Sequence, residues 1–320
     1  MNRKYLVLGC LLGAVAASGQ RLQASGTSTV FHASVDIVAL NVVVTNGHEK
    51  PVCGLQADNF TVLEDGVPQD VSFFAASQVP LDLAILLDTS ASMTDRLHVA
   101  QDAAVGFAMR LRPLDRISVV VINDSSKVVH PLDEDIGAAL AAIRETTAGG
   151  GTALYNGLYM SMREMTRQRR NNGEVRRQAI AVLSDGHDTT SLVSVDDVME
   201  VARQAGIAIY TITLKSSLPA KSTDQSGRLS YSTYDFAMRE LASETGARSF
   251  FPADIAELAG VYGVIAEELA SQYSLGYTSK NARQDGTFRK VMVRVDQPGT
   301  RTRTRSGYQA AHPSRRISLR

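Results

Sequence analysis

Residues 81–93, LDLAILLDTSASM, are the strongest indication of the fold that we predict for this chain. The first seven of these residues form a short, almost wholly apolar run, which is typical of a strand buried on both faces of a parallel sheet. Apolar residues then recur at helical spacing at Leu97, Ala100, Ala104, Ala108 and Leu111. The stretch therefore predicts a buried strand that ends near Asp88 and leads through a polar loop into a helix.

Strands and helices alternate beyond this unit, up to about residue 251. Further short apolar runs predict strands at 117–122, 179–183, 207–214 and 247–251. Helical spacing of apolar residues predicts helices at 134–146, 152–168, 194–205 and 236–245. This alternation favours an α/β fold with a doubly wound, mainly parallel sheet that helices cover on both faces.

Both flanks of this region show strand patterns instead. The N-terminal flank, 35–74, includes a hairpin signal in which 60–63 leads through Asp65-Gly66 to 71–74. In the C-terminal flank, a predicted helix with apolar positions from 255 to 269 precedes strand candidates at 273–277, 288–295 and 302–308. Each flank alone is marginal in size, so we predict that both ends pack into one small β domain.

The N-terminus is typical of a targeting segment. Arg3 and Lys4 precede the apolar run 5–17 and a small-residue exit, which is the order of a secretory signal peptide. The run is too short to span a bilayer as a helix, which needs roughly 20 residues. We therefore predict a secreted or periplasmic protein that is not an integral membrane protein.

The predicted organisation has five parts. They are a cleaved signal peptide at 1–24, an N-terminal β segment at 30–78, an α/β domain at 80–255, a helix with C-terminal strands at 256–308 and a disordered tail at 309–320. Removal of the signal peptide leaves Cys53 as a lone cysteine, which we expect to be buried and inert.

Composition argues against several functional classes. Lys+Arg and Asp+Glu number 33 each, so no net charge attracts nucleic acid or a membrane. Trp is absent and only 6% of residues are aromatic, which argues against stacking platforms for nucleic acid or sugars. The two cysteines exclude a disulfide scaffold and a Cys-based zinc site, and the six histidines show no metal-binding spacing.

Oxygen-bearing side chains follow the predicted strands at the points where these end. Asp88, Ser90 and Ser92 follow the first strand, Thr152 follows three glycines, and Asp185 follows the strand at 179–183. Ligands of open α/β sheets bind beyond the carboxyl ends of the strands, so we expect these five side chains to converge. Taken singly, each could instead cap a helix. Together they form an oxygen-only set with two negative charges, which suits a magnesium-class cation and not zinc or copper.

This set resembles the metal-ion-dependent adhesion site of von Willebrand factor type A domains, whose signature is D-x-S-x-S, a distant Thr and a distant Asp. The resemblance covers roughly 80–255 and implies a Rossmann-like fold. It implies that Ser90, Ser92 and Thr152 ligate the ion directly, while Asp88 and Asp185 hold it mostly through water. Ala91 stands where many members have glycine, a departure of one methyl group. The phrases FTVLEDGVPQ and QYSLGY also resemble a subgroup of secreted bacterial von Willebrand-A-related proteins.

The resemblance implies a non-enzymatic role in adhesion or assembly. A divalent cation, with Mg²⁺ foremost and Mn²⁺ or Ca²⁺ as alternatives, would recognise an Asp or Glu carboxylate of a protein partner; no nucleic-acid partner is expected. It also implies movement of the last helix, at 254–271. Two alternatives stay open: a structural scaffold with an idle metal site, and a magnesium-dependent phosphoryl-transfer hydrolase of haloacid dehalogenase type. The second lacks its general acid, because Ser90 stands where a carboxylate is needed.

Two further features of the sequence, an arginine cluster and a long polar stretch, are not part of the predicted metal site. Arginines cluster at positions 163, 167, 169, 170, 176 and 177, and we interpret them as a solvated helix end rather than a docking site for an acidic partner or nucleic acid. The long polar stretch 215–234 follows a strand on the metal side of the sheet, and we predict that it frames the partner surface. Oligomeric state is not encoded in any pattern that we recognise.

Overall fold

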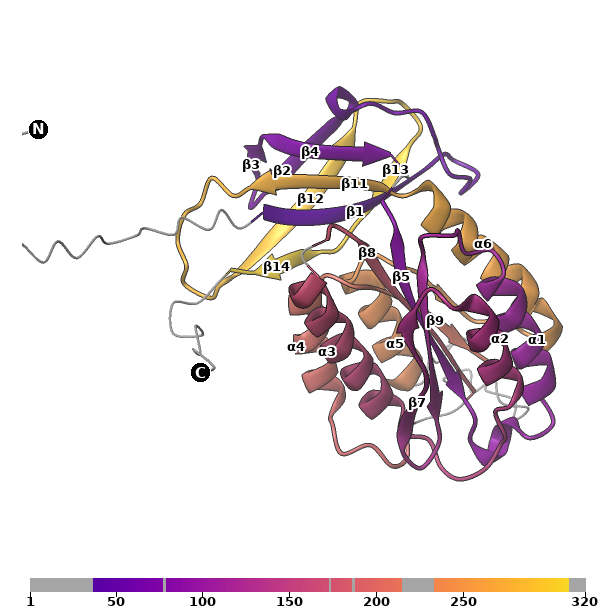
Figure 1. Cartoon of the computed structure of the whole chain (residues 1–320). Coiled ribbons are helices and arrows are strands. Elements are labelled where there is room, and N and C mark those ends of the chain that lie inside the picture. Colours follow the sequence, from indigo (N-terminus) through magenta and orange to yellow (C-terminus); the bar gives the residue numbers. More distant parts are fainter. Residues whose placement is uncertain (1–36, 77–78, 173, 186–187, 215–232, 311–320) are drawn as a thin grey trace, which may run out of the picture. The chain divides into compact units, whose positions relative to one another are not determined.

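A six-stranded sheet lies at the centre of the part of the chain that the computed structural model describes: residues 37–76, 79–172, 174–185, 188–214 and 233–310. In spatial order its strands are β10 (Ser249–Phe250), β9 (Ala208–Thr213), β8 (Arg177–Ser184), β5 (Leu81–Asp88), β6 (Arg116–Ile122) and β7 (Ser126–Asp133). All neighbours are parallel except β6 and β7 (Figure 1). The β5 strand is buried along its whole length, as its apolar run predicts.

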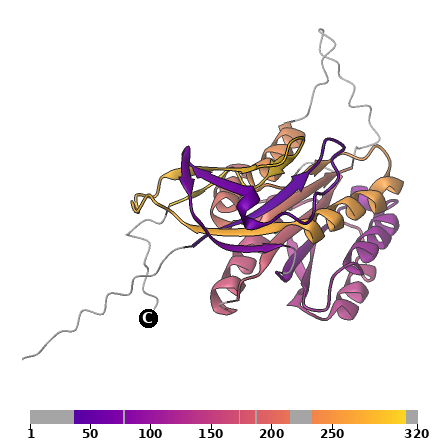
Figure 2. The same cartoon turned by 90° about the horizontal axis from the view of Figure 1, so that it is seen from above.

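Helices cover both faces of this sheet (Figures 1 and 2). One face packs against α1 (Leu97–Ala108), α2 (Ile136–Arg144) and α6 (Leu258–Ser271), and the other against α3 (Leu154–Asn172), α4 (Val195–Ala205) and α5 (Thr233–Glu244). Alternate residues of β5 serve the two cores, since Leu83 and Ile85 join the first and Leu86 the second. The predicted doubly wound α/β fold is confirmed.

The two flanks combine into a unit that we call the β annex, residues 37–76 and 273–310. One of its sheets has the order β13 (Arg301–Arg303), β1 (Ile37–Thr45), β11 (Tyr273–Thr278) and β4 (Val71–Ala76). The other has the order β14 (Gly307–Gln309), β12 (Phe288–Val295), β2 (Phe60–Glu64) and β3 (Val67–Gln69). Apolar residues of both flanks share one core, including Leu40, Phe60 and Val293. The small β domain built from both ends of the chain is therefore confirmed.

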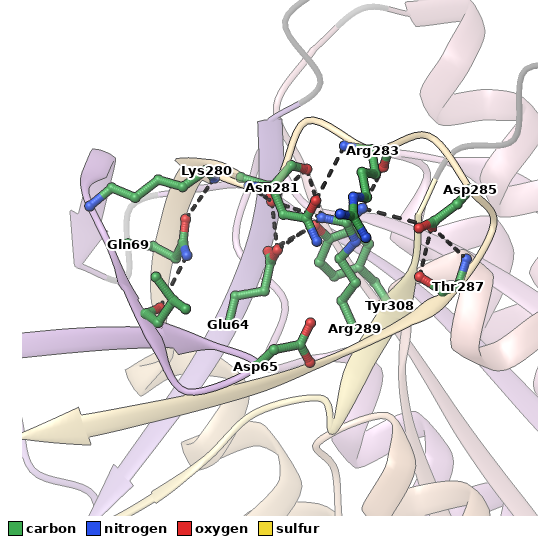
Figure 3. Close-up of polar contacts among 12 residues, drawn as sticks. Glu64, Asp65, Gln69, Lys280, Asn281, Arg283, Asp285, Thr287, Arg289 and Tyr308 are labelled. Atoms are coloured by element: carbon green, nitrogen blue, oxygen red, sulfur yellow. Dashed lines mark hydrogen bonds and ion pairs between the residues drawn. The ribbon is translucent and has the colours of Figure 1, made fainter.

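A buried ion pair ties the annex together (Figure 3). Glu64 of β2 and Arg289 of β12 are 2% and 1% exposed, and their charged atoms lie 3.3 Å apart. Glu64 also accepts hydrogen bonds at 2.8 Å from the hydroxyls of Tyr277 and Tyr308. Burial raises the pKa of Glu64, but hydrogen bonds, led by the one from Ser279, outweigh burial, so the net pKa lies below its usual value. Because Tyr277 belongs to the other sheet, this network fixes the packing of the two annex sheets.

Charged contacts also join the annex to the central sheet and its helices. Glu268 of α6 is buried and pairs with Arg303 of the annex and with Arg248 beside β10. The α6 helix ends at Ser271, and β11 of the annex begins at Tyr273. The annex therefore lies at the edge of the central sheet where β5 and β8 begin, away from the loop in which β5 ends (Figure 1).

Three sequence interpretations require correction. β7 has no counterpart among the predicted strands, because it is an edge strand of mixed polarity that contains Pro131. The hairpin at Asp65-Gly66 joins β2 to β3, whereas β4 crosses to the other annex sheet and pairs with β11. Cys53 is exposed, not buried.

Several predictions fall outside the described residues. They include the signal peptide, nearly all of the stretch 215–234 and most of the tail, although β14 extends to Gln309. The predicted domain boundaries stay predictions. Among the described residues, no helix combines the length and apolarity needed to cross a membrane.

Candidate metal site

The loop that follows β5 is organised around the carboxylate of Asp88, which is fully buried. Its Oδ1 accepts a hydrogen bond from the Ser90 amide at 2.9 Å, and its Oδ2 accepts one from the Ser184 hydroxyl at 2.6 Å. A short 3-10 turn, Ala91–Met93, follows, and the buried Met93 side chain anchors it in the core. The strand end and this apolar anchor together fix where Ser90 and Ser92 lie.

Three side-chain oxygens beside Asp88 form a continuous chain. The hydroxyls of Ser90 and Ser92 are 3.0 Å apart, and Ser92 donates to Asp185 Oδ1 at 2.8 Å. The other oxygen of Asp185 pairs with Arg96 Nη1 at 3.3 Å. Residues 93 positions apart in the sequence are thus brought together at the carboxyl ends of β5 and β8.

The glycine-rich loop is hydrogen-bonded to the loop after β5. Gly149 donates its amide to the Thr89 carbonyl at 2.8 Å, and Ala91 donates to the Gly150 carbonyl at 3.0 Å. Gly150 has a φ of +80°, and a Cβ built on it would lie 2.3 Å from Asp124 Oδ2. Only glycine fits this position, because a side chain would be both strained and in collision with Asp124.

Thr152 is buried and is held at the same edge of the sheet. Its amide donates to Thr189 Oγ1 at 2.9 Å, and its carbonyl accepts from the Thr189 amide at 2.8 Å. The amides of Tyr155 and Asn156 at the start of α3 donate to the side chains of Asp188 and Ser191. These amides at the start of α3 are therefore hydrogen-bonded by side chains other than that of Thr152. This argues against the interpretation of Thr152 as a simple helix cap.

Ser90 directly precedes the 3-10 turn and could likewise act as a cap. Its side chain makes no capping hydrogen bond to that turn. Its hydroxyl instead faces the Ser92 hydroxyl, in the group that includes Asp185. Hydroxyls that cap nothing are available as ligands.

The electrostatics of the site follow from two buried acids and one arginine. Burial raises the pKa of Asp88, and the neighbouring charge of Asp185 acts in the same direction. Arg96 balances part of this negative charge. Hydroxyl and carboxylate oxygens form the donor set, and no group of three or more His, Cys, Asp or Glu side chains is placed to hold a metal within the described ranges. The residues present thus fit a hard cation of the magnesium class.

Several supporting residues escaped the sequence interpretation. Ser184 orients Asp88, and Tyr234 of α5 hydrogen-bonds to Ser184 in turn. Asp124 accepts a hydrogen bond from Gly151 at 2.5 Å, and Thr189 holds Thr152. Ser184 is adjacent to the predicted ligand Asp185, so its position in the sequence could have indicated its role. Nothing in the local sequence around Tyr234, Asp124 or Thr189 indicates theirs.

Comparison with known proteins is consistent with this geometry. Residues 82–263 match the profile of the von Willebrand factor type A domain. A solved von Willebrand factor type A protein from Catenulispora acidiphila superimposes with a TM-score of 0.50 at 12% identity, covering 88% of this chain and 75% of that one. At that identity the likeness shows the fold alone.

Two relatives match in sequence. An uncharacterized protein of Synechocystis sp. is 35% identical over 114 residues, which are 35% of this chain and 26% of that protein. An uncharacterized protein of Borreliella burgdorferi is 24% identical over an alignment of 232 positions, which covers 67% of this chain and 62% of that protein. This chain thus spans less than two thirds of the length of either relative.

Proposed function

The chain belongs to the von Willebrand factor type A domain family, and from that premise we propose that it binds a divalent cation and recognises a protein partner through it. Domains of this family generally mediate protein interactions and are not catalysts. The proposed ligands are the five oxygen-bearing residues singled out in the sequence: Asp88, Ser90, Ser92, Thr152 and Asp185. Mg²⁺ is the first candidate, and Mn²⁺ and Ca²⁺ are alternatives.

One observation carries this proposal: hydroxyls that cap no helix gather at one sheet edge around two buried carboxylates. Ser90 and Ser92 lie within hydrogen-bond distance of each other, and Ser92 reaches Asp185. Thr152 lies two residues beyond Gly150, whose carbonyl binds the amide of Ala91 between the two serines. A helix-capping role does not explain this convergence.

The chemistry follows from the charges of the donors. In the proposed arrangement Ser90, Ser92 and Thr152 contact the ion, and Asp88 and Asp185 act mostly through water. The cation would supply Lewis acidity toward a further anionic oxygen, because neutral hydroxyls leave its charge only partly balanced. An Asp or Glu side chain of a partner protein is the ligand that completes such a site. The exposed Ser92 marks the side from which the partner approaches.

We place this recognition outside the cytoplasm, because the first residues have the order of a secretory signal peptide. An exported module that holds a cation and a partner carboxylate would serve adhesion or assembly. The resemblance implies that the last helix, α6, moves. Because Glu268 of α6 pairs with Arg303 of the annex, a shift of α6 would displace this contact with the annex.

A cation titration by calorimetry tests the proposal. The unaltered protein should bind Mg²⁺ or Mn²⁺, and the Asp88→Ala, Ser90→Ala double variant should not. Asp70→Ala with Ser72→Ala is the matched control, because it removes the same D-x-S pair from the annex, where Asp70 is exposed. The control should bind as the unaltered protein does.

A second assay separates the functions. Retention of a partner that is lost on chelation supports metal-bridged recognition, whereas retention that chelator leaves unchanged identifies a scaffold with an idle site. Turnover of a phosphate ester that disappears in the double variant would establish the hydrolase instead.

A further inference from the structure

A cavity of about 450 Å³ lies at the edge of the central sheet opposite the candidate metal site. Its lining comes from the annex strands β1, β4 and β11, from Val79 just before β5, from the start of β8 and from the end of α3. Apolar side chains form much of its wall, among them Leu40, Phe73, Val79, Val175 and Leu275. The cavity is thus large enough for a small organic molecule.

Four arginines line this cavity, and two of them are already satisfied. Arg176 pairs with Asp82 at 2.6 Å, and Arg177 donates to the carbonyls of Val79 and Leu269. Arg169 and Arg305 differ, because neither makes an ion pair or a side-chain hydrogen bond with another of the described residues. Arg305 stacks over the ring of Tyr308 at 5.4 Å, and its Nε is buried without a hydrogen-bond acceptor.

The two unpaired guanidinium groups lie close together. A Cβ built on Gly206, the residue that ends α4, would lie 3.0 Å from Arg305 Nη1 and 4.0 Å from Arg169 Nη1. Burial, with the charge of Arg169 adding to it, lowers the pKa of Arg305 to about 10. Burial also lowers the pKa of Arg169. Two half-buried cations therefore lie near each other. The acid in the cavity lining, Glu174, is exposed and pairs with Arg176 instead, so an added anion would stabilise the two arginines.

We propose that this cavity binds an organic oxyanion, a carboxylate or a phosphate monoester, whose charged group bridges Arg169 and Arg305 and whose apolar part contacts Phe73, Val79 and Leu275. The guanidinium groups recognise the oxygens through charge-assisted hydrogen bonds. The apolar wall recognises the substituent, so the ligand is a molecule larger than an inorganic anion. This site gives Arg169 of the arginine cluster a role that a solvated helix end does not explain.

Calorimetry with three probes tests the site in metal-free Tris chloride buffer at constant ionic strength. Octanoate and octyl phosphate carry the two candidate head groups on one apolar chain, and acetate carries a head group without it. We expect saturable binding of octanoate or octyl phosphate, whichever head group the site prefers, and at least about tenfold weaker binding of acetate. Acetate binding as tight as octanoate would overturn the role of the apolar wall.

Substitutions locate the binding. Arg169→Met should weaken binding by about 10- to 100-fold, since a charge-assisted hydrogen bond contributes about 1.5–3 kcal/mol. Arg167→Met is the matched control, because Arg167 lies on the same helix, is exposed and pairs with Glu164 instead. It should leave the affinity unchanged.

The thermal unfolding midpoint supplies an independent readout. Without ligand, Arg169→Met should unfold at the same or a higher temperature than the unaltered protein, because a half-buried positive charge is removed from beside Arg305. Octanoate or octyl phosphate should raise the midpoint of the unaltered protein but not that of the variant. The proposal is overturned if neither probe saturates the unaltered protein at millimolar concentration, or if Arg169→Met binds as tightly as the control.

Discussion

Arg96 holds Asp185 in the absence of a cation, and this predicts an unusual outcome for Arg96→Gln: tighter metal binding. Arg96 Nη1 lies 3.3 Å from Asp185 Oδ2, with side chains that are 24% and 3% exposed. Cation and guanidinium have the same sign and compete for the same carboxylate. Removing the guanidinium charge while keeping a polar side chain should therefore leave Asp185 more available.

The expected size follows from the exposure of the pair. Fully exposed ion pairs contribute about 0.2–1 kcal/mol, and fully buried ones are worth more when one partner is lost. Because Arg96 is partly exposed to solvent and Asp185 is buried, we take about 1 kcal/mol for the pair. That energy corresponds to a gain of about fivefold in cation affinity.

Calorimetric titration with Mn²⁺ measures this gain directly. Arg110→Gln is the control, since it removes the same charge from an exposed position just beyond the other end of α1. The control should change the affinity by less than about twofold, because exposed charges at that distance are screened by salt. An affinity of Arg96→Gln equal to or below that of the unaltered protein would show that Arg96 positions Asp185 rather than competing with the cation for it.

Three further predictions concern the acid in the site, the annex and the glycine loop. Burial raises the pKa of Asp88 above its ordinary 3.8, and the cation needs the deprotonated carboxylate. Cation affinity should therefore decrease as the pH is lowered through this raised pKa. A calorimetric pH series in which affinity is unchanged down to the ordinary pKa would contradict this. Arg289→Met leaves Glu64 buried without its partner and should lower the free energy of unfolding by about 3–5 kcal/mol in urea denaturation; the double variant with Glu64→Gln should lose less, and an equal or larger loss would show that the pair is not coupled. Gly150→Ala should abolish most cation binding while circular dichroism stays unchanged, because a methyl group there meets Asp124; binding that survives would mean that the loop relaxes freely.

The central sheet was predictable because its strands carry a strong local signal. The β5 strand is apolar over nearly its whole length and is buried on both faces, so its position and its end at Asp88 follow from the residues. The β7 strand lacks such a signal, since it lies at the sheet edge with a mixed burial pattern. The pairing partners of the strands could not be predicted either. Nothing in the sequence of 71–76 distinguishes pairing with the hairpin strand β2 from the observed pairing with β11.

The residues of the candidate site likewise fall into those that the sequence predicts and those that it does not. Asp88, Ser90 and Asp185 follow strands whose ends the sequence marks, so their convergence could be expected. Asp124 and Thr189 lie in loops whose contacts arise only when the strands assemble. The arginine cluster shows the limit most clearly, because sequence cannot separate the paired Arg176 from the unpaired Arg169 of the same cluster.

The proposed cation site can be located by anomalous scattering from a crystal soaked in Mn²⁺, a measurement that depends on neither affinity nor a partner. We predict one strong peak in contact with the hydroxyls of Ser90, Ser92 and Thr152, and its loss in crystals of the Asp88→Ala, Ser90→Ala variant. A peak elsewhere on the protein, or none at this sheet edge at millimolar Mn²⁺, would contradict it.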